Sequence, residues 1–408
     1  MRRRTFLLSA STLGAAGMMW RYWPEDGWVN ECQQAMPAGL MQHPLVLKAM
    51  EGLNFSQVWD NHVHLVGVAG QGQGVWVNPE MQSWNHPIKH AQFRFYLDGS
   101  CVKPGDSSNA DYINRLNSLM HELPTGMKAM LLAFDYYHEA DGSKSPEKSS
   151  IYTSNEYVSR VVAANPDRYE WVASIHPYRE DSIFQLEQAK KNGARAVKWL
   201  PEAMGIDPVS KKCDAFYDAM QRLDLPLLSH AGHETAVGTA GGKDLNNPLL
   251  LRYPMDRGVR VIIAHCASLG KAVDLDAGPK AREILCFDLF KRMMAEPDYE
   301  GLLFGDISAV LQLNRLSRPV KELLLKPEWH ARLINGSDYP LPGIYPLFPL
   351  KQILRTGLIE RRHFDVLRKV RDYNPVWFDF LLKRMINWQG QSFSSSVFET
   401  RRHFLYAT

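Results

Sequence analysis

This chain of 408 residues contains few cysteines and carries little net charge. Five cysteines without regular spacing exclude a disulfide-framed scaffold, and we place none of them in a metal site. The formal net charge is only +3, from 47 basic and 44 acidic residues, and no long basic run appears. We therefore expect neither a nucleic-acid partner nor internal repeats. With 45% hydrophobic residues, the chain can build a globular core.

The chain also lacks an N-terminal apolar stretch of the roughly 20 residues that a typical membrane-spanning helix needs. The segment from Thr5 to Trp20 is uncharged, but it is short and rich in glycine, alanine and serine. The sequence 3-RRTFL-7 resembles a twin-arginine export signal, with a short basic tail before a buried helix as the alternative. We expect residues 1–20 to be such a signal or a membrane tether, and the protein to be exported, to the periplasm.

Eight short apolar runs recur at spacings that fit a repeat of strand and helix. With the residues that follow them, they are 58–66, 126–134, 171–177, 194–201, 225–234, 259–268, 301–308 and 331–340. About 330 residues remain when the ends are set aside, which is within the range of one barrel with insertions. We predict an α/β fold, a distorted TIM (β/α)8 barrel over residues 46–388 with an insertion after its first strand.

Four of these runs end in residues that a divalent metal prefers, namely His62 with His64, His230, His265 and Asp338. Strand side chains alternate between faces, so the first two histidines point the same way, about 7 Å apart. In a parallel barrel the carboxyl ends of all strands converge on one face. A lone histidine at a strand end is more often structural, and the aspartate could form an Asx turn. Their joint placement favours a metal site.

The motifs around these residues resemble those of the amidohydrolase superfamily. More narrowly, they resemble its branch of metal-dependent hydrolases and decarboxylases related to aminocarboxymuconate-semialdehyde decarboxylase. The likeness spans 57–385 and is carried by Lys198 and by 60-DNHVH-64, 229-SHAGHE-234, 263-IAHCASLG-270 and 335-NGSDYP-340. It includes the segment 373–385, which is similar to the helix that closes the family's barrel, with Asn374 as its cap and Pro375 at its first position.

This resemblance implies that His62, His64, His230 and Asp338 hold a divalent cation, usually Zn²⁺, with Mn²⁺ as the alternative. His265 would either bind a second metal or form a hydrogen bond with the reactive water. Lys198 would be carboxylated and bridge two metals, or grip a substrate carboxylate. Its plain alternative is a lysine at the rim, in solvent.

Such a ligand set would leave most of the metal charge uncompensated, so that bound water loses its proton near neutral pH. Asp338 would act as ligand and as general acid and base, with His265 as the second catalytic residue. We predict hydrolysis of an amide or lactone of a small molecule. The first alternative is nonoxidative decarboxylation of an unsaturated or aromatic acid, with Arg94 and Arg179 as candidates to hold its carboxylate. The second is a noncatalytic metal-binding barrel.

The remaining segments concern specificity and assembly. Residues 66–125 are longer than a barrel loop and helix require, which predicts a lid or substrate wall, with Trp76 as a candidate to touch the substrate. Residues 21–45 are expected to be a linker or to wrap the barrel. The tail 389–408 is expected to be flexible or to dock on another subunit of a homo-oligomer. Cys32 and Cys101 lie outside the repeat and could form a bridge after export, although the odd total speaks against a regular pattern.

Overall fold

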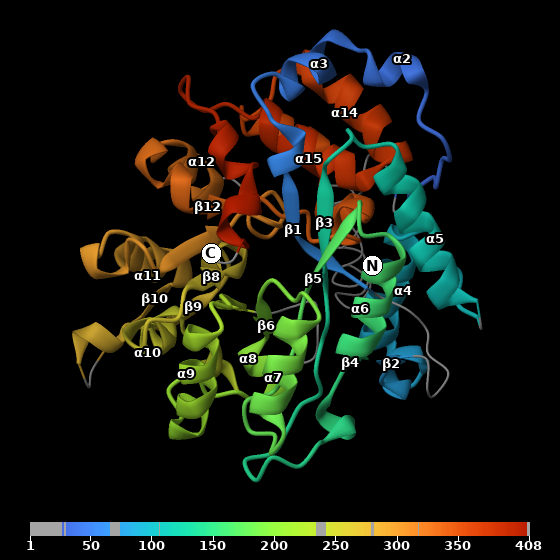
Figure 1. Cartoon of the computed structure of the whole chain (residues 1–408). Helices are drawn as coiled ribbons and strands as arrows, with labels where there is room; N and C mark the ends of the chain where they lie inside the picture. The colour runs from blue at the N-terminus through green and yellow to red at the C-terminus, as the bar shows by residue number, and fades with distance from the viewer. Residues whose placement is uncertain are drawn as a thin grey trace, which may run out of the picture.

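The computed structural model describes residue 27 and residues 30–65, 74–105, 107–233, 242–278, 281–316 and 318–405. Each of the eight predicted runs contributes one strand to a parallel barrel with helices around it (Figure 1). The strands are β1 Trp59–His64, β3 Lys128–Leu132, β5 Tyr169–Val172, β6 Val197–Trp199, β7 Leu227–Ser229, β8 Val261–Ile263, β11 Leu303–Asp306 and β12 Leu333–Ile334. The predicted (β/α)8 fold is confirmed.

The barrel closes through short contacts that lie beyond the regular strands. Strand order is β1-β3-β5 in one sheet and β12-β11-β8-β7-β6 in the other. A parallel bridge between Ala173 and Val197 joins the two sheets on one side, and one between Val63 and Tyr339 joins them on the other. The amide of His64 donates to the Tyr339 carbonyl at 2.9 Å. Closure through the segment that follows β12 explains why the barrel is distorted, and it draws that segment against β1.

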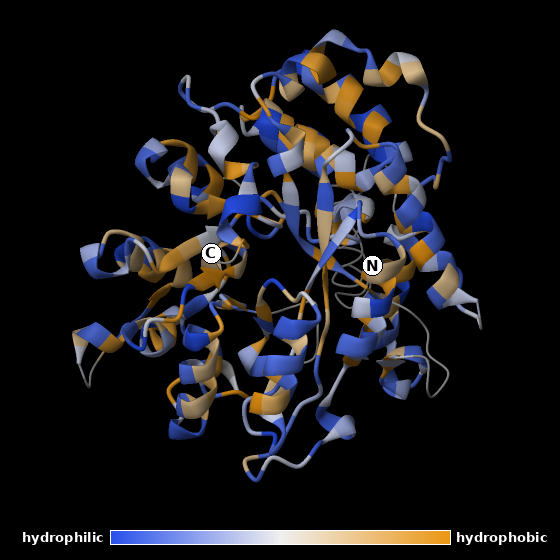
Figure 2. Ribbon diagram, in the orientation of Figure 1, coloured by the Kyte–Doolittle hydropathy of each residue, from blue (hydrophilic) through white to orange (hydrophobic). Residues whose placement is uncertain are grey.

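Most outer helices are amphipathic, and Figure 2 shows α14 with both hydrophobic and hydrophilic residues. The helices are α2 Ala38–Met41, α3 Pro44–Met50, α4 Pro87–Gly99, α5 Ser108–His121, α6 Asn155–Ala164, α7 Ser182–Lys191, α8 Pro201–Met204, α9 Asp214–Arg222, α10 Arg252–Asp256, α11 Cys286–Met294, α12 Arg318–Leu324, α13 Leu350–Arg355, α14 Arg361–Tyr373 and α15 Pro375–Met385. Helix α15 is buried along nearly its whole length. As predicted, Asn374 caps it, because its side chain accepts a hydrogen bond from the Trp377 amide at 3.0 Å.

The C-terminal tail seals the interior of the barrel. The interior cluster includes Trp59 of β1 and Ile334 of β12, and it also contains Phe404 from the tail. The rings of Trp59 and Phe404 stack with centroids 6.5 Å apart, and Trp59 also exchanges hydrogen bonds with Thr400. The described part of the tail therefore packs on its own barrel at the end opposite to the carboxyl ends of the strands.

The segment before the barrel packs on its outside and is linked to the insertion. Cys32 and Cys101 form a disulfide across a sequence separation of 69 residues, with 5.6 Å between their Cα atoms. The other three cysteines are buried and free. Helix α3 lies along α15, where the Arg384 guanidinium donates to the Ala49 carbonyl at 2.7 Å. The export-signal segment 1–20 lies outside the described residues, and none of the described helices is both long and apolar enough to cross a membrane.

The insertion after β1 is tied back to a later loop. Its strand β2 (Val75–Val77) pairs antiparallel with β4 (Ile151–Thr153), which follows β3 in the chain. A second antiparallel strand pair, β9 (Lys271–Val273) with β10 (Glu283–Leu285), follows β8. The glycine-rich start of the insertion, residues 66–73, lies outside the described residues.

Candidate metal centre

A bulge in β1 brings its two histidines to the barrel mouth. Trp59 faces the interior cluster, and strict alternation would send His62 to the opposite face of the strand. The register of β1 with β3 shifts between Asp60 and Val63, which resets the alternation. His62 and His64 then lie on one face, with ring centroids 5.1 Å apart. The predicted pairing of these two side chains is therefore present.

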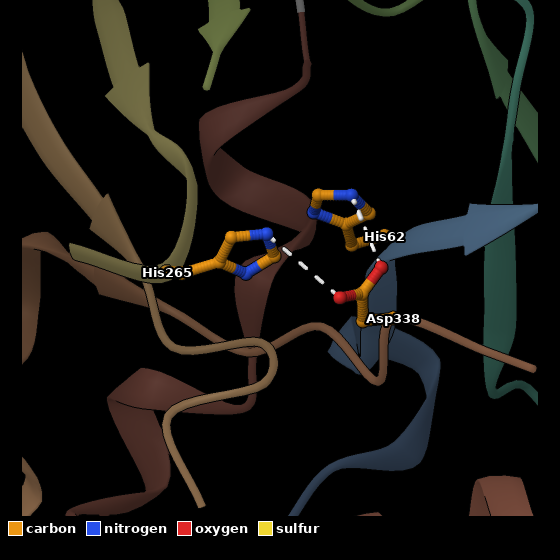
Figure 3. A group of neighbouring side chains, drawn as sticks. All are labelled: His62, His265 and Asp338. Carbon is orange, nitrogen blue, oxygen red and sulfur yellow. Dashed lines mark ion pairs between the residues drawn. The ribbon is translucent and has the colours of Figure 1, made fainter. Parts of the chain in front are cut away.

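Three side chains from three strand ends form the tightest part of the cluster (Figure 3). His62, His265 and Asp338 each offer one ligand atom, and these atoms lie within 4.8 Å of one another. The two carboxylate oxygens of Asp338 divide between the rings, with Oδ1 3.6 Å from His62 Nε2 and Oδ2 3.8 Å from His265 Nε2. All three side chains are buried. Residues separated by as many as 276 positions thus face one point.

The other three candidates surround this trio. His64 Nε2 lies 3.1 Å from the Oδ1 atom of Asp338, and the His230 ring stands edge-on to that of His265 at 5.4 Å. Lys198 Nζ lies 3.5 Å from His62 Nε2, and the lysine is only 1% exposed. The alternative of a rim lysine in solvent is therefore wrong. The structure gathers all six predicted metal-site residues, although His265 is more central than the sequence suggested.

Two residues that sequence reasoning missed hold the imidazoles in place. Asp306, at the end of β11, accepts a hydrogen bond from His62 Nδ1 at 2.6 Å. Ser308 follows it, and its carbonyl oxygen lies 3.0 Å from His265 Nδ1. A carbonyl and an ionised carboxylate only accept, so both rings carry their proton on Nδ1 and present the Nε2 lone pair to the centre. The seventh apolar run, like the four that carry the predicted ligands, ends in polar residues, and this feature of the sequence could have identified Asp306 and Ser308.

The backbone at the site adopts a conformation that favours glycine. His265 has φ of 55°, the next two residues continue at 51° and 48°, and Asp338 has φ of 60°. Such left-handed conformations are costly for residues with a Cβ, and they persist where surrounding contacts enforce them. The turns direct the side chains of His265 and Asp338 inward. Cys266, as expected, is buried away from the cluster, and its Sγ donates to the Asp306 carbonyl at 3.4 Å.

Burial and neighbouring charges set protonation states that suit a metal. Burial, followed by the nearby Lys198 ammonium, lowers the pKa of His62, and burial with the charge of Arg315 holds the pKa of His265 well below its usual range. Burial alone would raise the pKa of Asp338, but contacts with the surrounding histidines hold it well below its usual range. Neutral imidazoles and an ionised carboxylate are the forms that bind metal ions.

The predicted substrate-binding residues lie apart from this trio. Arg179 donates to Asp135 at 3.1 Å and forms a bidentate pair with Asp181 at 2.9 Å. It lines a cavity of about 670 Å³ at the loops after β3 and β5. Arg94 is half-exposed on α4, 3.7 Å from Asp98 of the same helix. Among the described contacts, no hydrogen bond or ion pair joins either arginine to the histidine cluster.

Trp76 stands at the rim on β2. Its ring lies 5.6 Å from that of Tyr136, which stacks on Tyr152 at 4.0 Å. These three rings line a cavity of about 550 Å³, and the two tyrosines also line the cavity of Arg179. Trp76 and Arg179 therefore border adjoining hollows. A further cation was missed by the sequence: the buried Arg315 donates to Ser268 Oγ at 3.2 Å and acts on His265 through its charge.

The donor set fits a divalent cation. Nitrogen and carboxylate ligands suit zinc, manganese and related ions, and the Nδ1 bonds of both central histidines leave Nε2 available as a ligand atom. A carboxylate partner behind a metal-binding histidine is a common feature of such sites, and the Asp306–His62 pair provides one.

Comparisons with known proteins give a family match over part of the chain. A family model described as amidohydrolase matches residues 84–284. That range contains Lys198, His230 and His265, whereas His62 and Asp338 lie outside it and are brought in by the fold. A dihydroorotase from Picosynechococcus sp. is 31% identical over 94 residues, which are 21% of this chain and 27% of that protein. The chain thus spans about a quarter of the length of this curated relative.

Two solved structures are similar at low identity. An uncharacterised TIM-barrel protein from Bordetella bronchiseptica is 13% identical, with a TM-score of 0.47, over 74% of this chain and 99% of that one. The 5-carboxyvanillate decarboxylase of Sphingomonas paucimobilis is 12% identical, with a TM-score of 0.42, over 76% and 95%. These distant likenesses carry no information on activity, and the match to the family model is the more specific finding. Over residues 84–284, just under half of its length, the chain is similar to the amidohydrolase family.

Proposed function

We propose that this protein is a metal-dependent hydrolase that cleaves a carbonyl-type bond, an amide or a lactone, of a small molecule. The observation that carries the proposal is the convergence of one ligand atom each from His62, His265 and Asp338 within 4.8 Å at a buried point. The proposed ligands are His62, His64, His230 and Asp338. His265, which belongs to the group within 4.8 Å, is proposed to bind either a second metal ion or the reactive water. Zn²⁺ is the proposed ion because three imidazoles and one carboxylate are typical of its sites, and Mn²⁺ is the alternative.

The chain's own residues would supply the proton transfers. A divalent cation at this point contributes Lewis acidity, which polarises a carbonyl and acidifies water. Asp338 is ionised at neutral pH because its pKa is held well below the usual range, so it can accept a proton from the attacking water and return it to the leaving group. His265 has its proton on Nδ1 and can accept a hydrogen bond from that water through Nε2. Lys198 is the cation adjacent to His62 and would face developing negative charge.

Nonoxidative decarboxylation is the second candidate, and the position of Arg315 favours it. A decarboxylase needs a cation to hold the substrate carboxylate. Arg179 forms ion pairs with two aspartates and Arg94 with one, so both are weaker candidates to bind a substrate carboxylate than the sequence suggested. Arg315 is buried and donates to Ser268, three residues after His265, and its charge contributes to the lowered pKa of His265. Lys198 and Arg315 are therefore the proposed carboxylate contacts in that reaction.

The test combines metal analysis with a substrate screen. We expect purified protein to contain a stoichiometric divalent metal, and turnover to disappear on chelation and return with Zn²⁺ or Mn²⁺. Two metal equivalents falling to about one in Lys198→Ala would indicate that Lys198 is a carboxylated bridging ligand and not a cation, and would favour hydrolysis. Among lactones, amides and unsaturated carboxylic acids, carbon dioxide release identifies the decarboxylase. Turnover that survives complete metal removal would refute the metal dependence of both reactions and leave the metal a noncatalytic role.

We also propose that the protein is exported, with the N-terminal segment as signal or tether. The Cys32–Cys101 disulfide supports this proposal, because such bonds form and persist in oxidising compartments. Changing Arg3 and Arg4 to lysine is expected to retain the protein in the cytoplasm in its reduced form. Unchanged recovery from the periplasmic fraction would contradict the proposed route.

A further inference from the structure

Helix α15 buries a charged pair beneath the metal centre. Lys383 and Asp379 lie four residues apart, both at 0–1% side-chain exposure, and Nζ donates to Oδ2 at 2.6 Å. The free-energy cost of removing two charges from water usually offsets their attraction, so a buried ion pair is weak evidence for a gain in stability. The position of the Lys383–Asp379 pair indicates a role other than a gain in stability.

The lysine reaches past its partner to the backbone that carries Asp338. Its Nζ also donates to the Gly336 carbonyl at 2.6 Å, two residues before the carboxylate. Gly336 is tightly enclosed: a Cβ there would lie 2.7 Å from His62 Cβ and 3.1 Å from Asp306 Oδ1. The Lys383 bond therefore holds a residue that lies against both His62 and its carboxylate partner Asp306.

Asp60 holds the same segment from the side of β1. Its Oδ1 accepts the Ser337 amide at 2.7 Å and the His62 amide at 3.1 Å. The Asp338 amide in turn donates to the His62 carbonyl at 2.8 Å. One buried carboxylate thus connects the two strand ends that carry the central ligands, while the lysine supports one of them from behind.

We infer that Lys383 and Asp60 are positioning residues that set the spacing of His62 and Asp338 and thereby the affinity of the site for its divalent cation. The inference rests on the proposed metal-dependent function. Asp338 is in the left-handed region, at φ of 60°, and such a residue relaxes unless contacts enforce its conformation. The bonds to Gly336 and Ser337 are the contacts directly before it that do so.

The test removes the pair without leaving a lone buried charge. The double variant Lys383→Met with Asp379→Leu replaces both members by apolar groups, which is tolerated better than loss of one partner. Zinc affinity is measured on the full chain by competition with a chromophoric chelator, together with the visible spectrum of the Co²⁺-substituted protein. We expect zinc binding about 10- to 100-fold weaker than in the wild type, the range seen when outer-shell partners of metal ligands are lost, and a changed Co²⁺ spectrum.

The matched control is Arg371→Met, which removes another fully buried cation, on α14, that donates to the Phe348 carbonyl at 3.0 Å. It is expected to lower thermal stability and leave zinc affinity unchanged. Should the double variant fail to fold, Asp60→Asn carries the test, because a neutral acceptor weakens both amide bonds; at least threefold weaker zinc binding is expected. A folded double variant, or failing that a folded Asp60→Asn, with wild-type zinc affinity overturns the inference. A wild type that binds no zinc or manganese overturns the proposed function instead.

Discussion

The substitution Asp306→Asn tests whether the β11 carboxylate prepares His62 for metal binding. The carboxylate is fully buried, accepts from His62 Nδ1 at 2.6 Å, and also accepts from the Ser308 hydroxyl at 2.6 Å and its amide at 2.7 Å. Asparagine keeps the size and one acceptor oxygen but removes the charge. If its NH₂ group turns toward Nδ1, the ring proton moves to Nε2 and blocks the ligand atom.

The expected loss follows from the strength of the bond. A hydrogen bond to a charged group contributes about 1.5–3 kcal/mol, which corresponds to roughly 10- to 100-fold in zinc affinity. At free zinc about 1,000 times the wild-type Kd, bound metal stabilises the wild type by about 4.1 kcal/mol. A variant with 100-fold weaker binding would gain only about 1.4 kcal/mol at that concentration.

Urea unfolding with and without zinc measures this difference, and chelator competition gives the affinity directly. Asp372→Asn is the matched control, because this half-buried carboxylate accepts from the Tyr345 hydroxyl at 2.5 Å, away from the site. It should leave the gain from zinc unchanged. Equal zinc affinities of wild type and Asp306→Asn would refute the assigned role of the carboxylate.

Three further outcomes are expected. Burial lowers the pKa of His176 to about 3, so between about pH 6.5 and 3 only the unfolded state takes up a proton on this ring. The free energy of unfolding therefore decreases as the pH is lowered through this range, by up to about 1.4 kcal/mol per pH unit. In urea titrations, His176→Gln should make this decrease smaller. Replacing Cys32 and Cys101 by serine should lower the free energy of unfolding by about 4 kcal/mol, given the 69-residue separation, and a loss under 1 kcal/mol would contradict the constraint. Gly336→Ala should lower the free energy of unfolding by about 1–3 kcal/mol and weaken zinc binding, because the new methyl group would clash with His62. A melting temperature equal to that of the wild type, both with and without zinc, would contradict this clash.

Much of the fold and the identity of the central residues followed from local patterns. Apolar runs of strand length at regular spacing predict strands that are buried on both faces, and such runs are visible in the local sequence. The ends of these runs identified His62, His230, His265 and Asp338, since parallel strands bring their carboxyl ends together. The pairing of Cys32 with Cys101 was anticipated only as one option.

The remaining features depend on contacts between segments far apart in the chain. The bulge in β1, the burial of Lys198 and the pairing of Arg179 with aspartates could not be read from local sequence, because each depends on neighbours supplied by other strands and loops. By itself the sequence determined which residues stand at the strand ends, through the periodicity of the backbone. Only the tertiary structure decided how they are oriented, because the orienting hydrogen bonds of Asp306 and Lys383 cross tens to hundreds of residues.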